Sequence, residues 1–297
     1  MDKEQWLADR FEEHRAHLRG VSYRMLGSLT EADDAVQDTW LRVSRSGAED
    51  VENIRGWLTT IVARVCLNML RSRNVRREES FGIHLPDPVV SREGEFKPEE
   101  EALLADSVGL ALLVVLDTLA PAERLAFVLH DVFELPFEEI APLVGRTPVA
   151  ARQLASRARR RVKGADVPAP DPDLVRQRKV VDAFLRAARG GDFEDLIAVL
   201  HPDVVLRHDF GAKHPALNRV IRGAAAVAQQ ARLGAALPGA QVHPALVNGA
   251  AGLIVTVGGR PFAIMGFIVA DEKIVEIDVI ADPKRARRLA STVLASR

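Results

Sequence analysis

The residue types best suited to contacting nucleic acid are concentrated in one segment, from Phe137 to Lys163. At 100° per residue, the polar and basic side chains of its second half fall on one side of a helix. These side chains are Arg152, Gln153, Ser156 and Arg160. Arginine can donate two hydrogen bonds to a guanine edge, glutamine can pair with adenine, and flanking arginines can contact phosphate. Seven basic residues and no acid lie between Arg146 and Lys163.

Two helices joined by a tight turn would position this face. The apolar residues of 137–144 follow helical spacing, and Gly145 can supply the positive φ that ends a helix. Thr147 can cap the next helix, and Pro148 suits its first position. A helix-turn-helix presents a recognition helix to the major groove in this way. The alternative is an ordinary packing helix with a solvated basic face. The turn residues Gly145 and Thr147-Pro148 argue against this alternative.

A second basic helix is predicted from Ile54 to Asn74. Its buried stripe is expected to comprise Leu58, Ile61, Val62, Val65 and Met69. The opposite face carries Thr60, Arg64, Asn68 and Arg71. Trp57 lies near the start of this helix, where it is either part of the core or a platform for an unstacked base. Such a face suits single-stranded nucleic acid.

Acidic residues gather elsewhere, although the net charge of the whole chain is only −1. In the helix predicted through residues 31–43, Glu31, Asp34 and Asp38 fall on one outer line. Acids in a first turn also favour the helix dipole, but Asp38 lies beyond that turn. Two basic patches separated by acidic ones indicate contact with DNA at two places and with a basic partner.

The composition indicates a cytoplasmic protein of two or three domains. The chain has 297 residues, of which 47% are hydrophobic. No apolar run approaches the length of a membrane span, and the N-terminus lacks a signal-peptide pattern. The lone cysteine, Cys66, excludes an internal disulfide and is expected to be buried. We expect no membrane association, no metal site and no cofactor.

The predicted fold class is two all-α domains followed by an α+β domain. The all-α domains span 1–77 and 101–164 and are separated by an extended linker at 78–100. A helix is expected from Pro121 to Phe133. A second Pro-rich linker, 165–173, leads to the α+β domain at 174–297. That domain should contain two helices, a strand near residues 204–210 and antiparallel hairpins with turns at Gly258-Gly259 and Asp271-Glu272.

Residues 31–43, 54–73 and 119–162 together resemble an extracytoplasmic-function (ECF) sigma factor, the minimal class of bacterial sigma subunit. The resemblance implies that core RNA polymerase, through its β′ clamp helices and β flap, and promoter DNA are the partners. It implies that the polymerase-binding residues are Glu31, Asp34, Asp38 and Trp40. The −10 element would be bound by Trp57, Arg64, Asn68 and Arg71. The −35 element would be bound by Arg152, Gln153, Ser156, Arg157 and Arg160. Such proteins have no catalytic centre of their own.

Residues 174–297 resemble a SnoaL-like domain of the NTF2 superfamily, a curved antiparallel sheet around a cone-shaped pocket. A branch of ECF factors carries this fusion, and its linker and tail signatures are similar to His84–Pro88 and Asp209–Lys213. The resemblance implies that the domain controls the sigma factor in cis. We expect Asp209 and Lys213 to lie near Leu85, Pro86 and Pro88. Removing everything after Lys163 should then change promoter-directed transcription.

Other roles for the tail and for the whole chain stay open. His208, Asp209 and Asp278 could act as acid and base in an enzyme, although the apolar strands suit a small apolar ligand or an empty core better. The whole chain could instead be a helix-turn-helix transcriptional regulator that acts without polymerase. The acidic helix around Asp38 favours the sigma factor, because a plain repressor has no need of it.

Overall fold

The computed structural model describes residues 3–46, 51–77, 84–94, 110–164 and 170–294. The chain divides into two compact units. Unit 1 comprises Met1–Glu79, Lys97–Val108 and Leu112–Val167, and unit 2 comprises Ser80–Phe96, Gly109–Ala111 and Pro168–Arg297. Unit 1 is helical and unit 2 is α+β, so the predicted fold class is confirmed.

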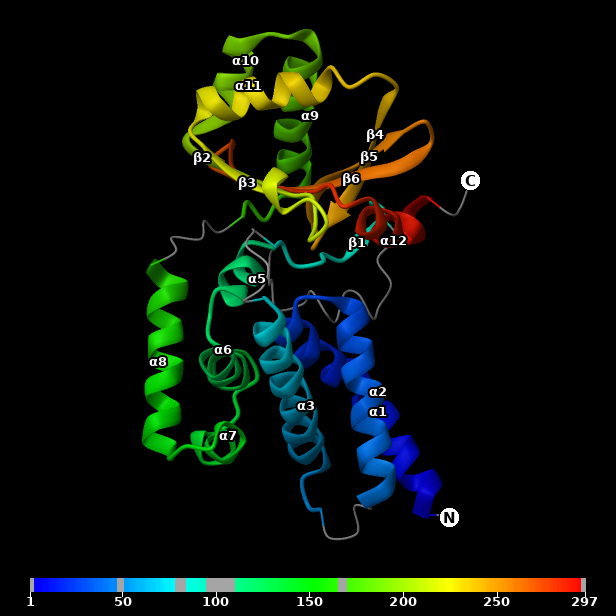
Figure 1. The fold of residues 1–297 in the computed structure, drawn as a ribbon, viewed down its shortest axis with the longest axis vertical. Coiled ribbons are helices and arrows are strands. Elements are labelled where there is room, and N and C mark those ends of the chain that lie inside the picture. The colour runs from blue at the N-terminus through cyan, green and yellow to red at the C-terminus, as the bar shows by residue number, and fades with distance from the viewer. Residues whose placement is uncertain (1–2, 47–50, 78–83, 95–109, 165–169, 295–297) are drawn as a thin grey trace. The chain divides into compact units, whose positions relative to one another are not determined.

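Three long helices pack against one another in the first part of unit 1 (Figure 1). They are α1 (Lys3–Leu26), α2 (Leu29–Ser46) and α3 (Ile54–Arg77). Gly27 adopts a φ of 72°, which an L side chain rarely adopts, and separates α1 from α2. The core between these helices includes the fully buried Phe11, Leu18 and Leu58.

Five shorter elements complete the described part of unit 1, and the first of them begins with two residues of unit 2. They are α5 (Leu110–Asp117), α6 (Pro121–Phe127), the π-helical turn η1 (Val128–Val132), α7 (Phe137–Val144) and α8 (Pro148–Gly164). The predicted helix from Pro121 to Phe133 is therefore split, because its last turn widens into η1. Gly145 has a φ of 67° and ends α7, as predicted. The Ala150 amide donates to Thr147 Oγ1 over 3.3 Å at the start of α8.

The buried surface of α3 is wider than the stripe predicted for it. Ala63, Cys66 and Leu67 are buried in addition to Leu58, Val62 and Val65, while Ile61 and Met69 are only half-buried. The reason is that α3 packs against α6 and α7 as well as α1 and α2. The prediction for Cys66 is confirmed, and burial raises the pKa of its thiol to about 12.

Unit 2 is built on one seven-stranded sheet in the order β1-β4-β5-β6-β7-β2-β3. Its strands are β1 (Val90–Ser91), β2 (Leu200–Asp209), β3 (Arg219–Arg222), β4 (Ala240–Val247), β5 (Ala250–Val257), β6 (Arg260–Ala270) and β7 (Lys273–Ile280). The helices are α9 (Leu174–Gly190), α10 (Phe193–Val199), the short 3-10 helix η2 (Pro215–Leu217), α11 (Ala224–Ala235) and α12 (Pro283–Leu294). The sheet is mixed, not a pure antiparallel meander, because β2 pairs parallel to β7.

The hairpins of unit 2 follow from local turn chemistry. Gly258 and Gly259 both have positive φ, as do Asp271 and Glu272, and they join β5 to β6 and β6 to β7 at the predicted positions. A third turn of the same kind, Asn248-Gly249, joins β4 to β5. We did not predict this turn, although Asn-Gly between two β-branched runs is a strong hairpin signal.

The linker predicted at 78–100 needs correction. Its described part, residues 84–94, is extended but belongs to the sheet of unit 2, because Val90 and Ser91 pair with Val247 and Leu246 of β4. Just before this pairing, the Val89 amide donates to Asn248 Oδ1 over 2.7 Å, and the Asn248 amide returns a bond of 2.8 Å to the Val89 carbonyl. This segment is therefore a docked edge strand.

Candidate functional site

The face of α8 that the sequence assigns to DNA is exposed. Arg152, Gln153 and Arg160 are exposed and Ser156 is half-buried, while Ala151, Ala155 and Ala158 form the buried side. Ala150, Leu154 and Val162, which flank this inner face, are only half-buried. Small residues let α8 approach α6 and α7 closely and leave the polar side outward.

Arg157 differs from the other predicted −35 residues. Its Nε donates to Glu123 Oε1 of α6 over 2.8 Å, and Arg161 contacts the other oxygen of the same carboxylate at 3.3 Å. Arg159 pairs similarly with Asp131. These ion pairs fix α8 to the elements beneath it, so Arg157 has a structural role that the helical spacing did not indicate.

Arg152 is held in place by an aromatic ring. Its guanidinium carbon lies 5.3 Å from the centroid of the Phe137 ring, and the His130 ring lies 3.9 Å from Phe137. A cation above an aromatic face is attracted to it, and stacking limits the rotamers of the arginine. The ring therefore restricts the conformations of Arg152, one of the side chains predicted to contact bases.

The second predicted DNA face lies on α3. Arg64, Asn68 and Arg71 are exposed on successive turns, as a polar contact surface requires. Trp57 is half-buried near the start of the helix, and its carbonyl accepts a hydrogen bond from Thr60 Oγ1 at 2.8 Å. Trp57 thus combines packing with an accessible edge.

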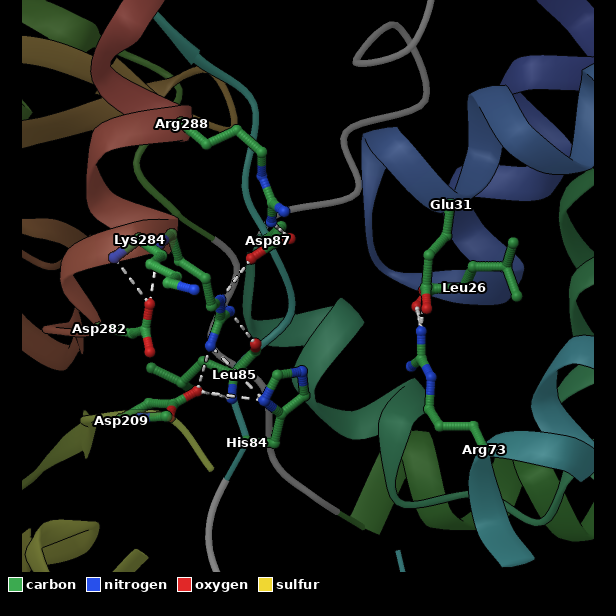
Figure 2. Close-up of polar contacts among 12 residues, drawn as sticks. Leu26, Glu31, Arg73, His84, Leu85, Asp87, Asp209, Asp282, Lys284 and Arg288 are labelled. Carbon is green, nitrogen blue, oxygen red and sulfur yellow. Dashed lines mark hydrogen bonds and ion pairs between the residues drawn. The ribbon is translucent and has the colours of Figure 1, made fainter. Parts of the chain in front are cut away.

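The three acids predicted on the outer line of α2 differ in their pairing. Asp34 is exposed and Asp38 is partly exposed, where Asp38 pairs with Arg42 at 2.9 Å. Glu31, in contrast, forms an ion pair with Arg73 of α3, which also donates to the Leu26 carbonyl over 3.1 Å (Figure 2). Glu31 therefore has a bond within unit 1 in addition to its predicted place on the acidic line, and its side chain stays 36% exposed.

Trp40, the remaining residue predicted at that surface, packs on α1. Its ring lies 5.0 Å from that of Phe11, which is buried, and the tryptophan itself is half-buried. Asp34 and Asp38 are thus the predicted polymerase-binding residues that have no partner on another helix in the described part of the chain, and Glu31 is the one that pairs with α3.

A network in unit 2, here called the linker clamp, joins Leu85 and Asp87 to Asp209 and Arg285. The Leu85 amide donates to Asp209 Oδ2 over 2.8 Å, which confirms the predicted proximity of these two residues (Figure 2). Arg285 of α12 bridges the rest, because its Nε donates to Asp87 at 2.7 Å and its Nη1 to Asp209 at 2.6 Å. Its Nη2 donates to the Leu85 carbonyl. Arg288 also pairs with Asp87.

The buried charges of the linker clamp are paired with one another. The Asp209 side chain is fully buried, and Arg285 is 12% exposed. Burial alone would raise the pKa of Asp209, but the hydrogen bond with His84, the charge of Arg285 and the Leu85 amide outweigh it and hold that pKa well below its usual range. Asp209 is therefore an anion at neutral pH.

The three other residues predicted to lie near the linker clamp differ in their exposure. Pro86 and Pro88 are buried, whereas Lys213 is exposed on its loop. Gly211 has a φ of 79°, and a Cβ at this position would lie 2.3 Å from Asp282 Oδ2. Asp282 caps α12 by accepting from the Lys284 and Arg285 amides (Figure 2). A side chain at position 211 would therefore displace the Asp282 cap of α12, the helix that carries Arg285.

The sequence did not single out Arg285, Arg288 or Asn248. A signal for Arg285 existed, because Asp282-Pro283 is a helix-start pattern that places position 285 in the first turn. Asn248 could have been found through the Asn-Gly hairpin. Neither pattern reveals the distant partner, because Arg285 bonds to Asp87, 198 residues earlier, and Asn248 bonds to Val89, 159 residues earlier.

A mostly apolar cavity of about 220 Å³ lies in the interior of unit 2. Its wall includes Phe184, Leu206, Phe210, Met265 and Ile277, and His208 contributes a polar edge. Burial, followed by the charge of Arg219, lowers the pKa of His208 to about 4, so this imidazole is neutral at pH 7.

The two aspartates predicted as acid/base partners of His208 are not in that wall. Alternate residues of a strand face opposite sides. Asp209 follows His208 and enters the clamp, and Asp278 lies opposite Arg207, to which it is bonded at 3.1 Å. Burial and the neighbouring Glu276 raise the pKa of Asp278. The cavity therefore lacks the paired groups on which the enzyme hypothesis depended.

The described residues include neither a membrane-spanning helix nor a group of metal-ligating side chains. Within the described ranges, no helix has the length and apolar character needed to cross a bilayer. Across the same residues, no three His, Cys, Asp or Glu side chains are grouped as they would be around a metal ion.

Comparison with known proteins identifies relatives of both units. Residues 10–76 match the model of Sigma-70 region 2, and residues 109–162 match that of Sigma-70, region 4. The ECF RNA polymerase sigma factor SigJ of Mycobacterium tuberculosis is 39% identical over 288 residues, covering 93% of this chain and 91% of that protein. The probable ECF sigma factor SigI of the same species is 39% identical over 194 residues, covering 64% and 66%.

One solved structure matches nearly the whole fold. The crystal structure of Mycobacterium tuberculosis SigJ matches with a TM-score of 0.71 and 34% identity, covering 94% of this chain and 97% of that one. An NTF-2 like protein of unknown function from Burkholderia xenovorans covers 37% of this chain, with 17% identity and a TM-score of 0.26.

Proposed function

The chain belongs to the ECF RNA polymerase sigma factors, and we propose that three of its helix faces divide the work of such a subunit. In this proposal α2 binds core polymerase, α3 binds the −10 element and α8 binds the −35 element. Membership of this family does not fit the alternative of a helix-turn-helix regulator that acts without polymerase. Because the proposed partner is core polymerase, the proposed compartment is the cytoplasm.

The observation that carries this proposal is the separation of exposed polar faces from buried apolar ones on α3 and α8. Arg64, Asn68 and Arg71 are exposed on α3, where they can meet an opened strand. Arg152, Gln153 and Arg160 are exposed on α8, where they can meet base edges and phosphates. For polymerase, Asp34 and Asp38 would bind the β′ clamp helices, and the region-4 helices would meet the β flap.

We expect Arg152→Ala to relax discrimination at one position of the −35 element. Loss of a bidentate base contact costs about 1 to 3 kcal/mol, so the preferred base should lose roughly five- to a hundredfold of its advantage. The measurement is transcription by reconstituted holoenzyme from a promoter library randomised in the −35 region. Arg146→Ala, which removes an exposed arginine before α8, is the control and should weaken all sequences alike. Equal base preferences in Arg152→Ala and the wild type would contradict the assignment.

The C-terminal domain is proposed to modulate this activity in cis through the linker clamp. The bonds from Asp209 and Arg285 to Leu85 and Asp87 tie the segment between the two sigma regions to the sheet of unit 2. Because the clamp lies in the same chain, it is formed at a high effective concentration. The fraction of molecules in which the linker clamp is formed would determine how freely sigma regions 2 and 4 adopt the spacing that a promoter requires.

Asp209→Asn tests this modulation in the full-length chain. The substitution removes the charge that faces Arg285 but keeps the size of the side chain, so we expect promoter-directed transcription to change severalfold. Asp203→Asn on the same strand is the matched control, because Asp203 is exposed. Transcription should be measured with core polymerase at saturating sigma factor, so that differences in polymerase affinity do not enter. Unchanged transcription in Asp209→Asn would refute a regulatory clamp.

A second candidate role for the domain is to bind a small apolar molecule. The cavity of about 220 Å³ and its apolar wall favour this role over catalysis. Asp209 and Asp278, which a catalytic mechanism would have used, are engaged by arginines instead.

A further inference from the structure

Two large apolar side chains are exposed in the part of unit 1 that the structure describes, Leu41 at 46% and Val149 at 62%. Single exposed apolar residues are common on protein surfaces and by themselves indicate nothing. These two, however, both lie on faces proposed to bind a partner. Leu41 comes three residues after Asp38 on α2, and Val149 comes three residues before Arg152 on α8. Val149 is the more exposed of the two, and its neighbours define what it can contact.

Val149 lies in the first turn of α8, which begins at Pro148. Residues three and four apart are neighbours on a helix surface, so Val149 adjoins Arg152 and Gln153. All three side chains are exposed, while the buried side of α8 is formed by alanines. The N-terminal residues of a recognition helix are those that contact base edges in the major groove. Val149 therefore belongs to the face that is proposed to bind the −35 element.

The chemistry of valine limits what this position can recognise. The side chain of Val149 has two methyl groups and no hydrogen-bonding atom, so it cannot bond to the nitrogen and oxygen atoms of a base edge. In the major groove, thymine presents a C5-methyl group, and the other three bases present no methyl group there. Contact between valine and that methyl group removes apolar surface of both from water.

We propose that Val149 reads a thymine of the −35 element through the C5-methyl group of that base. Three residues of an α-helix advance by about 4.5 Å, and successive base pairs of duplex DNA lie about 3.4 Å apart. The thymine therefore adjoins the base pair that Arg152 contacts. This inference rests on the proposed function of α8, and it adds one apolar contact to the polar contacts already assigned to that helix.

The test replaces thymine by deoxyuridine, which lacks only the C5-methyl group and pairs with adenine in the same way. Reconstituted holoenzyme with the full-length chain receives two competing promoters, which differ by one deoxyuridine at a −35 thymine, and transcripts from each are counted. The wild type should prefer the thymine promoter at one position by about three- to fivefold, the value of one buried methyl group. Val149→Ala should lower this preference to nearly one, and its transcripts from both promoters show that the variant is folded.

Two further variants separate the methyl contact from other causes. Val175→Ala removes the same atoms from a valine of unit 2 that is 64% exposed, and it should keep the preference for thymine. Arg152→Ala should also keep it, because the methyl contact does not involve the guanidinium group.

Two results would overturn the inference. One is a wild type that distinguishes thymine from deoxyuridine at no −35 position, and the other is a preference that persists in Val149→Ala. Unchanged base preferences in Arg152→Ala would contradict the contact proposed for that arginine and leave the methyl contact standing. A holoenzyme that transcribes no natural promoter would instead contradict the proposed function itself, so the two can fail separately.

Discussion

Replacing Arg285 by alanine is expected to lower the free energy of unfolding of unit 2 by about 3 to 5 kcal/mol. Arg285 is 12% exposed and is bonded to Asp209, Asp87 and the Leu85 carbonyl. Its removal leaves the fully buried Asp209 carboxylate without its cation, and an uncompensated buried charge costs more than the pair contributes. Urea unfolding at pH 7, followed by far-UV circular dichroism, measures the effect.

The chain offers sharp controls for this measurement. Arg287→Ala changes an exposed arginine on the same helix and should cost little. All three tryptophans, Trp6, Trp40 and Trp57, lie in unit 1, so their fluorescence follows that unit separately. Adding Asp209→Asn to Arg285→Ala should recover part of the loss, because less buried charge remains. Equal stability of Arg285→Ala and Arg287→Ala would show that the clamp does not hold the linker.

The linker clamp should also make the stability of unit 2 decrease at acidic pH. The pKa of Asp209 is lower in the folded protein than in the unfolded chain, where an aspartate titrates near about 4. Its contribution to stability is therefore fully present above about pH 4 and is lost as the pH falls toward the folded pKa. The loss should be smaller in Asp209→Asn than in the wild type.

Asp38→Arg is expected to weaken association with core polymerase by roughly a hundredfold or more, since placing like charges together at an interface costs several kcal/mol. Asp38 is partly exposed, and its ion pair with Arg42 is a surface contact of small energetic value. The fold of unit 1 should therefore be unchanged. Binding of labelled sigma factor to core polymerase, measured by fluorescence anisotropy, gives the affinity.

The control for Asp38→Arg must carry the same change of charge. Glu13→Arg on α1 does so at an exposed position that pairs with Arg10 of its own helix. A second variant, Glu31→Gln, separates the two acids, because Glu31 is bonded to Arg73 and should affect stability more than binding. Wild-type affinity in Asp38→Arg would contradict the proposed polymerase surface.

The features that sequence reasoning predicted well are those encoded within a few residues. Gly145 and Thr147-Pro148 mark the turn before α8, and Gly258-Gly259 and Asp271-Glu272 form hairpins because their backbone requires positive φ. The exposed arginines of α3 and α8 follow in the same way from helical periodicity. Local conformational preferences of this kind are independent of the rest of the chain.

The features that were missed depend on contacts between distant residues. Glu31 falls on the acidic line of α2, yet Arg73, forty-two residues later, binds it. The parallel pairing of β2 with β7 and the attachment of Val90 to β4 likewise join segments whose own patterns are compatible with several partners. Arg285 was overlooked for the same reason. Its role becomes apparent only when Asp87 and Asp209 are known to lie beside it.

The short strand β1 has a consequence for how this domain can be shared among proteins. Val90 and Ser91 occupy the outer side of β4, so residues 170–294 moved alone into another gene would leave that side of the sheet bare. Unpaired backbone groups at a sheet edge recruit other chains, and such a transplant would tend to self-associate. The domain is therefore built from two separate segments of the sequence. A gene fusion that transfers it must include the segment around residues 84–94 as well as residues 170–294.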